Sequence, residues 1–126
     1  MIDLLDAPDH VAAVRFVDAL TGADFDQLTR EIEARLARHG QVGIVADLTE
    51  LRSVTPAALA KDIRYNVAKL GHWRQFPREA VVTQRAWIAA VTKALDPLVP
   101  QVAVRAFEPE ALADAIAWAG DFIPAP

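Results

Sequence analysis

The side chains able to act as nucleophiles or metal ligands are few in this sequence. Ser53 is the only serine and there is no cysteine, so Ser53 would have to be the nucleophile of a triad of the serine type. Its surroundings, residues 51–54, lack the glycines of a nucleophile elbow. The histidines, His10, His39 and His72, show no metal-ligand spacing. The sequence therefore predicts no enzyme, no metal site and no cofactor.

Asp47 is the most suggestive acidic residue, because it closes an apolar, β-branched run at 41–48 that predicts a buried central strand. Ligands and partners of open α/β sheets gather at the carboxyl ends of such strands. We therefore interpret Asp47, Ser53, Thr55 and Pro56 as a partner-binding segment. The alternative is structural, with Asp47 capping the following loop, Thr55 as the N-cap of a helix and Pro56 at its first position.

A second candidate site combines cations with aromatic rings. Between Lys61 and Arg85 there are six basic and two acidic residues, although the whole chain has a net charge of −4. Aromatic rings and cations together suit a small apolar or amphipathic ligand, such as an amphipathic anion, or the surface of a membrane. The alternative is that the rings fill the core and the charges stay solvated. The residues assigned to this ligand site are Lys61, Arg64, Tyr65, His72, Trp73, Arg74 and Phe76.

Length and composition define the class of protein. The 126 residues, 53% hydrophobic and 24% charged, predict one globular domain spanning 1–126. An acidic chain with one basic band is unlike a general nucleic-acid-binding protein. No apolar run is long enough to span a bilayer, and the first residues lack the pattern of a secretory signal. We therefore expect a cytoplasmic protein.

Hydrophobic periodicity and helix-end signals predict an α/β fold with the order β-β-α-β-α-β-α-β-α. The opening strands at 2–6 and 11–17 read as a hairpin, and Thr21 with Asp24 forms a capping box for a helix that ends at Gly40. Alternating strands and helices imply a mostly parallel sheet of four to five strands with four helices. The later elements are a strand at 42–48, a helix from 55 to 70, a strand at 80–83, a helix at 86–95, a strand at 101–107 and a helix after Pro109.

Several segments, in order and spacing, resemble the SpoIIAA-like family, a branch of STAS-type domains that shares the CRAL-TRIO, or Sec14-like, architecture. The matching segments are 21–25, Asp47-Leu48, 71–78, 80–82 with Trp87, 104–107, 110–112 and Ala117-Trp118. The resemblance implies a sheet with packed helices, an often dimeric state and no established catalysis. The phosphorylated serine motif of STAS-type anti-sigma factor antagonists corresponds here to residues 55–58, where both its serine and its glycine are missing.

These observations lead to two functional hypotheses. The first is a non-enzymatic binding module that holds a small apolar, amphipathic or lipid-like ligand, or docks on a membrane surface. The alternative is a protein–protein regulator that resembles anti-sigma factor antagonists but lacks their serine. A homodimer is expected from the resemblance.

Overall fold

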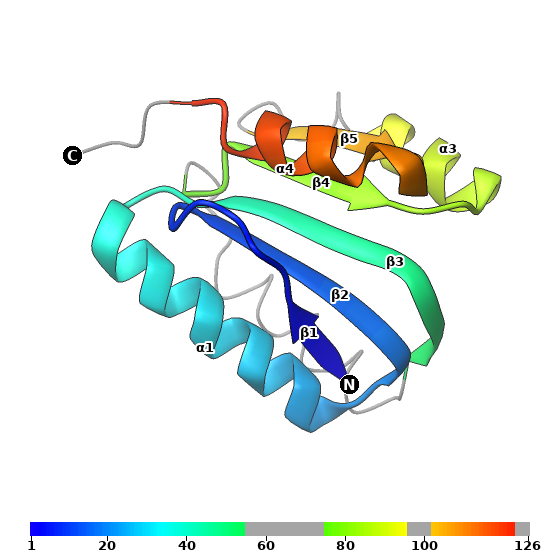
Figure 1. The fold of residues 1–126 in the computed structure, drawn as a ribbon, viewed down its shortest axis with the longest axis horizontal. Coiled ribbons are helices and arrows are strands. Elements are labelled where there is room, and N and C mark those ends of the chain that lie inside the picture. The colour runs from blue at the N-terminus through cyan, green and yellow to red at the C-terminus, as the bar shows by residue number, and fades with distance from the viewer. Residues whose placement is uncertain (55–74, 96–101, 123–126) are drawn as a thin grey trace.

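A computed structural model describes residues 1–54, 75–95 and 102–122 (Figure 1). These residues form an α/β fold with a five-stranded sheet. The helix predicted from Thr55 lies outside the described residues, which contain three α-helices. In chain order the elements are β1 Ile2–Leu4, β2 Val11–Leu20, α1 Gly22–His39, β3 Gly43–Val54, β4 Arg78–Val82, α3 Ala86–Leu95, β5 Ala103–Phe107, a 3₁₀ turn at Pro109–Ala111, and α4 Leu112–Ala119.

The strands lie in the sheet in their chain order, β1-β2-β3-β4-β5. β1 pairs with β2 in antiparallel fashion, and the other three pairings are parallel. This confirms the predicted opening hairpin and the mostly parallel sheet. β1 and β5 are the edge strands of this sheet.

Helix α1 begins and ends as the sequence predicts. The Thr21 hydroxyl accepts from the backbone N–H of Asp24, and the Asp24 carboxylate accepts from the N–H of Thr21. At the other end Gly40 has a φ of 72°, the left-handed conformation that glycine adopts without a steric penalty. The buried residues of α1 are Phe25, Leu28, Ile32 and Leu36, a stripe at helical spacing.

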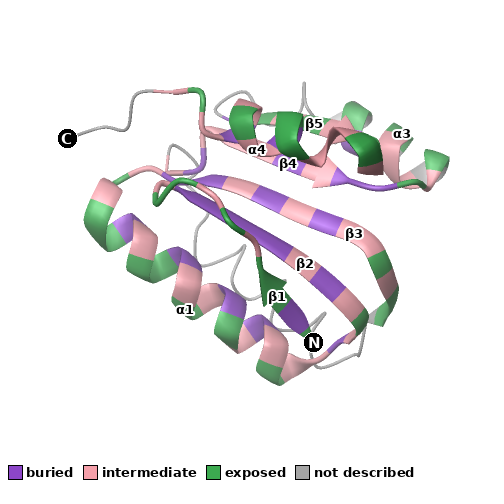
Figure 2. Ribbon diagram, in the orientation of Figure 1, coloured by how far each residue is buried: buried purple, intermediate pink, exposed green. Residues whose placement is uncertain are grey.

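The two faces of the sheet carry separate cores. One contains the buried stripe of α1, alternate residues of β2 such as Val14, and Phe76 just before β4. On the opposite face Val45 and Ala80 pack against Ala115 and Ala119 of α4. Burial is concentrated in β2 and along one side of α1 (Figure 2).

Topology explains which helix covers which face. The parallel strands advance in one direction from β2 to β5, so right-handed crossovers place the connecting helices α1 and α3 on the same face. α4 follows the last strand and returns across the other face, where it packs against β4, β3 and β2. The edge strand β5 therefore lies between α3 and α4.

Strand β3 differs from the prediction. We expected a strand at 42–48 followed by a loop, but β3 continues through twelve residues to Val54. The reason is that β2 is also long, and the second half of β3 pairs with it as far as Leu20 and Val54. The predicted loop from Asp47 to Thr55 is therefore wrong over its described part.

Gly43 marks the closest approach between β3 and α4. A Cβ built on it would lie 2.0 Å from the carbonyl oxygen of Ala119 and 3.3 Å from the ring of Phe122. The first distance is far below van der Waals contact, and its partner is backbone. The start of β3 thus requires a residue without a side chain.

We expect Gly43→Ala to lower the free energy of unfolding by about 1–3 kcal/mol or more, because the end of α4 must move away from the sheet. Urea denaturation followed by circular dichroism measures this. Gly22→Ala, at the first position of α1, is the control and should be neutral or slightly stabilising. Equal stability of Gly43→Ala and the unmodified chain would contradict the close approach.

Candidate functional site

Asp47 lies inside β3 and is held by three hydrogen bonds. Its Oδ2 accepts from Arg15 Nε at 2.9 Å, and its Oδ1 accepts from the backbone N–H and the hydroxyl of Thr49 at 3.0 and 2.7 Å. The side chain of Asp47 is only 2% exposed. Burial raises the pKa of Asp47, but the bonds from Thr49 and Arg15 outweigh it and hold the pKa below its ordinary value. Asp47 is therefore a buried carboxylate that fixes the β2–β3 register.

The position of Asp47 corrects the strand-end prediction. Asp47 pairs with Val82, where β4 ends, so it marks the end of the β3–β4 pairing and not the end of β3. Beyond it, the uncovered edge of β3 accepts from two side chains after β4, from Gln84 to the carbonyl of Thr49 and from Arg85 to the carbonyl of Leu51. The Asp47 carboxylate therefore bonds to Thr49 within the strand, where we expected it to cap a loop, and the partner-binding role of its segment stays a prediction.

The other predicted residues divide into three groups. Ser53 is exposed near the end of β3. Phe76 is 4% exposed and belongs to the core on the α1 face, as the alternative interpretation of its segment expects. The rest lie outside the described residues and stay predictions: Thr55, Pro56, Lys61, Arg64, Tyr65, His72, Trp73 and Arg74.

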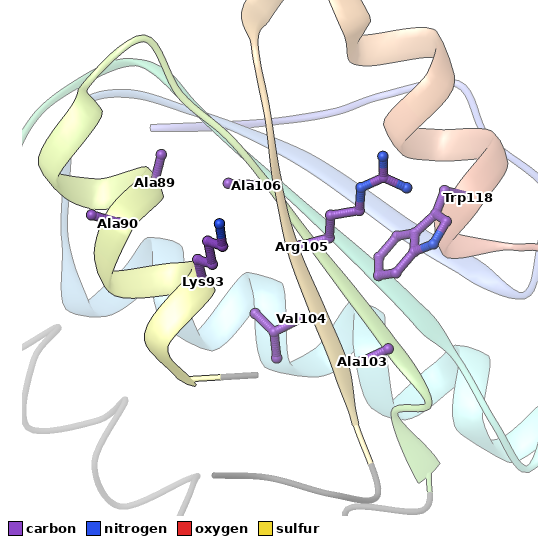
Figure 3. Close-up of a pocket in the computed structure, with 8 residues that line it drawn as sticks. All are labelled: Ala89, Ala90, Lys93, Ala103, Val104, Arg105, Ala106 and Trp118. Atoms are coloured by element: carbon purple, nitrogen blue, oxygen red, sulfur yellow. The ribbon is translucent and has the colours of Figure 1, made fainter. Parts of the chain in front are cut away.

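An open groove of about 590 Å³ lies along β5 (Figure 3). We call it the β5 groove. Val104 and Ala106 project toward α3, whereas Arg105 projects toward Trp118 on α4, and the amine of Lys93 extends into the space between α3 and β5. The walls are mainly small and apolar, with cations on both sides of the strand. Its lining residues are Ala89, Ala90, Lys93, Ala103, Val104, Arg105, Ala106 and Trp118.

Trp118 is surrounded by cations and by another aromatic ring. The guanidinium carbons of Arg78 and Arg105 lie 5.1 and 6.0 Å from the centroid of its ring, within the range of cation–π attraction. Arg78 Nη1 also donates to the carbonyl of Trp118 at 2.9 Å. The ring centroids of Phe107 and Trp118 lie 5.7 Å apart, and the guanidinium carbon of Arg105 lies 4.9 Å from the centroid of the Phe107 ring. These contacts fix the indole as one wall of the groove.

A second hollow of about 520 Å³ lies at the carboxyl ends of β4 and β5 and shares Ala89 with the β5 groove. It is more polar, with Arg85, Glu108 and Glu110 on its walls. Arg85 is already engaged with the carbonyl of Leu51, so it contributes mainly to the joint between β3 and the start of α3.

Sequence reasoning missed the β5 groove. It placed cations and rings together only where they are close in the chain, between residues 61 and 78. Lys93, Arg105 and Trp118 come from three elements and meet only through the fold. One feature of the sequence could have indicated the groove. In the alternating strand 103–107, Arg105 is a charged side chain on the same face as Phe107, and a helix that carries a tryptophan follows this strand.

The part of the chain that the structure describes contains neither a candidate membrane-spanning helix nor a cluster of metal-binding side chains. None of its helices combines the length and the apolar character needed to cross a membrane. Its His, Asp and Glu side chains form no group of three suited to hold a metal ion.

The sheet, its covering helices and the β5 groove define a small α/β domain. The chain belongs to the SpoIIAA-like family, whose model matches residues 11–120. It is similar to a crystal structure of an uncharacterized protein from Shewanella loihica PV-4 with a SpoIIAA-like fold. The two chains are 27% identical, the match covers 94% of this chain and 92% of that one, and the TM-score is 0.68. No protein with a curated description matches this chain.

These matches confirm the predicted SpoIIAA-like, STAS-type fold. Their descriptions name no Sec14-like protein, so the Sec14-like part of the resemblance has no support from them. The Shewanella structure is of an uncharacterized protein, so its description names no ligand or partner.

We expect Asp47→Asn to lower the free energy of unfolding at pH 7 by about 1–3 kcal/mol, since it removes the charge that Arg15 meets in a buried position. The pKa of Asp47 is depressed in the folded state, so its contribution is present above the unfolded pKa of about 4 and is lost as the pH falls through the folded pKa. The stability difference between the two proteins should therefore shrink below pH 4, as chemical denaturation across pH 2–8 would show.

The matched control for this experiment is Asp18→Asn, on the exposed surface of β2, which should change stability by less than about 0.5 kcal/mol. A stability difference for Asp47→Asn that is unchanged at pH 2, or absent at pH 7, would contradict the assigned role of the Asp47 carboxylate.

Proposed function

We propose that this protein is a non-enzymatic binding module that holds a small amphipathic molecule in the β5 groove. The observation that carries the proposal is the combination of small apolar walls, an indole and cations in one open groove. This is the ligand class predicted from the sequence, transferred to residues that the fold brings together. Lipid-like ligands, expected from the Sec14-like resemblance, fall within the same class.

The dimensions and chemistry of the groove support this proposal. A volume of about 590 Å³ lies within the roughly 300–1,000 Å³ of small-molecule sites. Ala89, Ala90 and Val104 offer an apolar surface, and Trp118 offers the face of a large ring. Lys93 and Arg105 have long stems that pack along apolar surface while their charges stay in water. A ligand with an apolar body and an anionic end complements all of these features.

The protein–protein regulator remains the second candidate function. It is favoured by the exposure of Ser53 near the carboxyl end of β3, two residues before the positions in the sequence, 55–58, that correspond to the switch motif of STAS-type regulators. The two functions use different parts of the molecule. Substitutions in the β5 groove should therefore leave a partner complex formed through Ser53 unaffected.

We expect octanoate, a short amphipathic anion, to bind and to be blocked by filling the groove. Ala90 is exposed on α3, so Ala90→Phe places a ring in the groove without disturbing the core and should weaken binding more than about tenfold. Lys93→Gln should weaken it by about three- to tenfold through loss of one cation. Isothermal titration calorimetry measures both effects.

The control variant is Arg52→Gln, which removes a cation that is 84% exposed and lies near the carboxyl end of β3, away from the groove. Its affinity for octanoate should match that of the unmodified chain. If neither Ala90→Phe nor Lys93→Gln changes the affinity for octanoate, or if octanoate, octyl phosphate and neutral octyl glucoside all fail to bind, the β5 groove is not a site for amphipathic ligands. Native mass spectrometry of the purified protein, followed by organic extraction, would identify any ligand that it retains.

A further inference from the structure

Two guanidinium groups share the indole of Trp118, although they come from different strands. Arg78 is the first residue of β4 and lies opposite Ala103, whereas Arg105 lies opposite Ala80. Residues 78 and 80 project to the same face of β4, so Arg78 and Arg105 are diagonal neighbours on the face that α4 covers. Their distances to the indole centroid, 5.1 and 6.0 Å, confirm that both approach one ring.

Bringing two guanidinium groups together on one ring concentrates positive charge. The carboxylate of Asp121 lies 3.8 Å from Arg78 Nη1, but it is 84% exposed and therefore strongly screened. Lys93, on the other wall of the groove, adds another cation. A negatively charged ligand at this end of the groove would relieve the repulsion between the arginines.

The geometry of stacked arginines favours one kind of anion. A guanidinium that stacks on a ring keeps its N–H groups in its own plane, where they donate to an oxyanion. Two such forks match a phosphate monoester, which offers three acceptor oxygens and a charge near −2, better than they match a carboxylate with two oxygens and one charge. The indole of Trp118 lies on the same side of β5 as Arg105, and the small residues that line the groove toward α3 lie on the other side of the strand.

We propose that the β5 groove recognises an amphipathic phosphate monoester. Arg78 and Arg105 bind the phosphate on the Trp118 side of β5, and the apolar body of the ligand lies against the indole and the small residues of the groove. This inference rests on the proposed function and adds the class of the head group. It also assigns a binding role to Arg78, which does not itself line the groove.

The experiment compares ligands that share an eight-carbon chain and differ in the head group: octyl phosphate, octanoate and neutral octyl glucoside. Inorganic phosphate and vesicles containing phosphatidate distinguish a free phosphate and a membrane surface from a soluble amphiphile. We expect octyl phosphate to bind at least about tenfold more tightly than octanoate and inorganic phosphate, because both its head and its chain are recognised.

Variants test the two arginines directly. Arg105→Gln and Arg78→Gln should each weaken octyl phosphate binding by about tenfold and reduce its preference over octanoate. Arg105→Lys keeps the charge but loses the fork, so it should recover only part of the affinity. Arg52→Gln again serves as the control. Because Arg78 also bonds the Trp118 carbonyl, thermal unfolding must show that Arg78→Gln remains folded, and Arg105→Gln gives the independent test.

The outcomes separate the two proposals. Equal affinities for octyl phosphate and octanoate, both sensitive to Ala90→Phe, would overturn the phosphate inference and leave the binding module intact. Binding of phosphatidate vesicles without binding of soluble octyl phosphate would also overturn it, since the groove would then not enclose the ligand. Failure of octyl phosphate, octanoate and octyl glucoside alike to bind would overturn both proposals.

Discussion

The pairing of β2 with β3 is the interaction on which the rest of the fold depends. It brings together the longest strands, and it is fixed from within the sheet by Arg15, Asp47 and Thr49. A one-residue slip of β3 would carry Val45 from the α4 core to the α1 core and Asp47 with it, so the register is strongly specified. The charge of Asp47 is satisfied only in the observed register, which adds a penalty against every alternative.

The same pairing determines how far β3 extends beyond its neighbour β4. β3 extends beyond its pairing with β4, and the side chains of Gln84 and Arg85 donate to the carbonyls of Thr49 and Leu51 in this part of β3. The chain after β4 is thereby bonded to β3 before α3 begins. As a result, α3 packs against β5 on the face of the sheet opposite α4. The eight-residue α4 returns on the opposite face and reaches β5 with Trp118. The groove is thus the space that two helices on opposite faces leave around an edge strand.

Local signals made most of the described fold predictable. The Thr21–Asp24 capping box, the glycine at position 40 and the apolar run that begins β2 each depend on neighbours in the chain, and each agrees with the structure. The length of β3 was not predictable in this way. Residues 49–54 are mostly polar and resemble a loop, yet they form a strand because they pair with the backbone of β2. Propensity was overridden by a pairing that sequence alone does not reveal.

The candidate site failed to emerge from the sequence for a related reason. A motif search groups residues that are near one another in the chain, whereas Arg78, Arg105 and Trp118 are joined by strand register and by the return of α4. Each alone has a structural explanation, such as the bond from Arg78 to the Trp118 carbonyl. Their combination is harder to explain by stability, because stacking a second guanidinium on one indole adds electrostatic repulsion along with cation–π attraction. Folding does not require this repulsion between the two guanidinium groups. A binding site for an anion, in contrast, needs cations placed close together at this edge of the sheet.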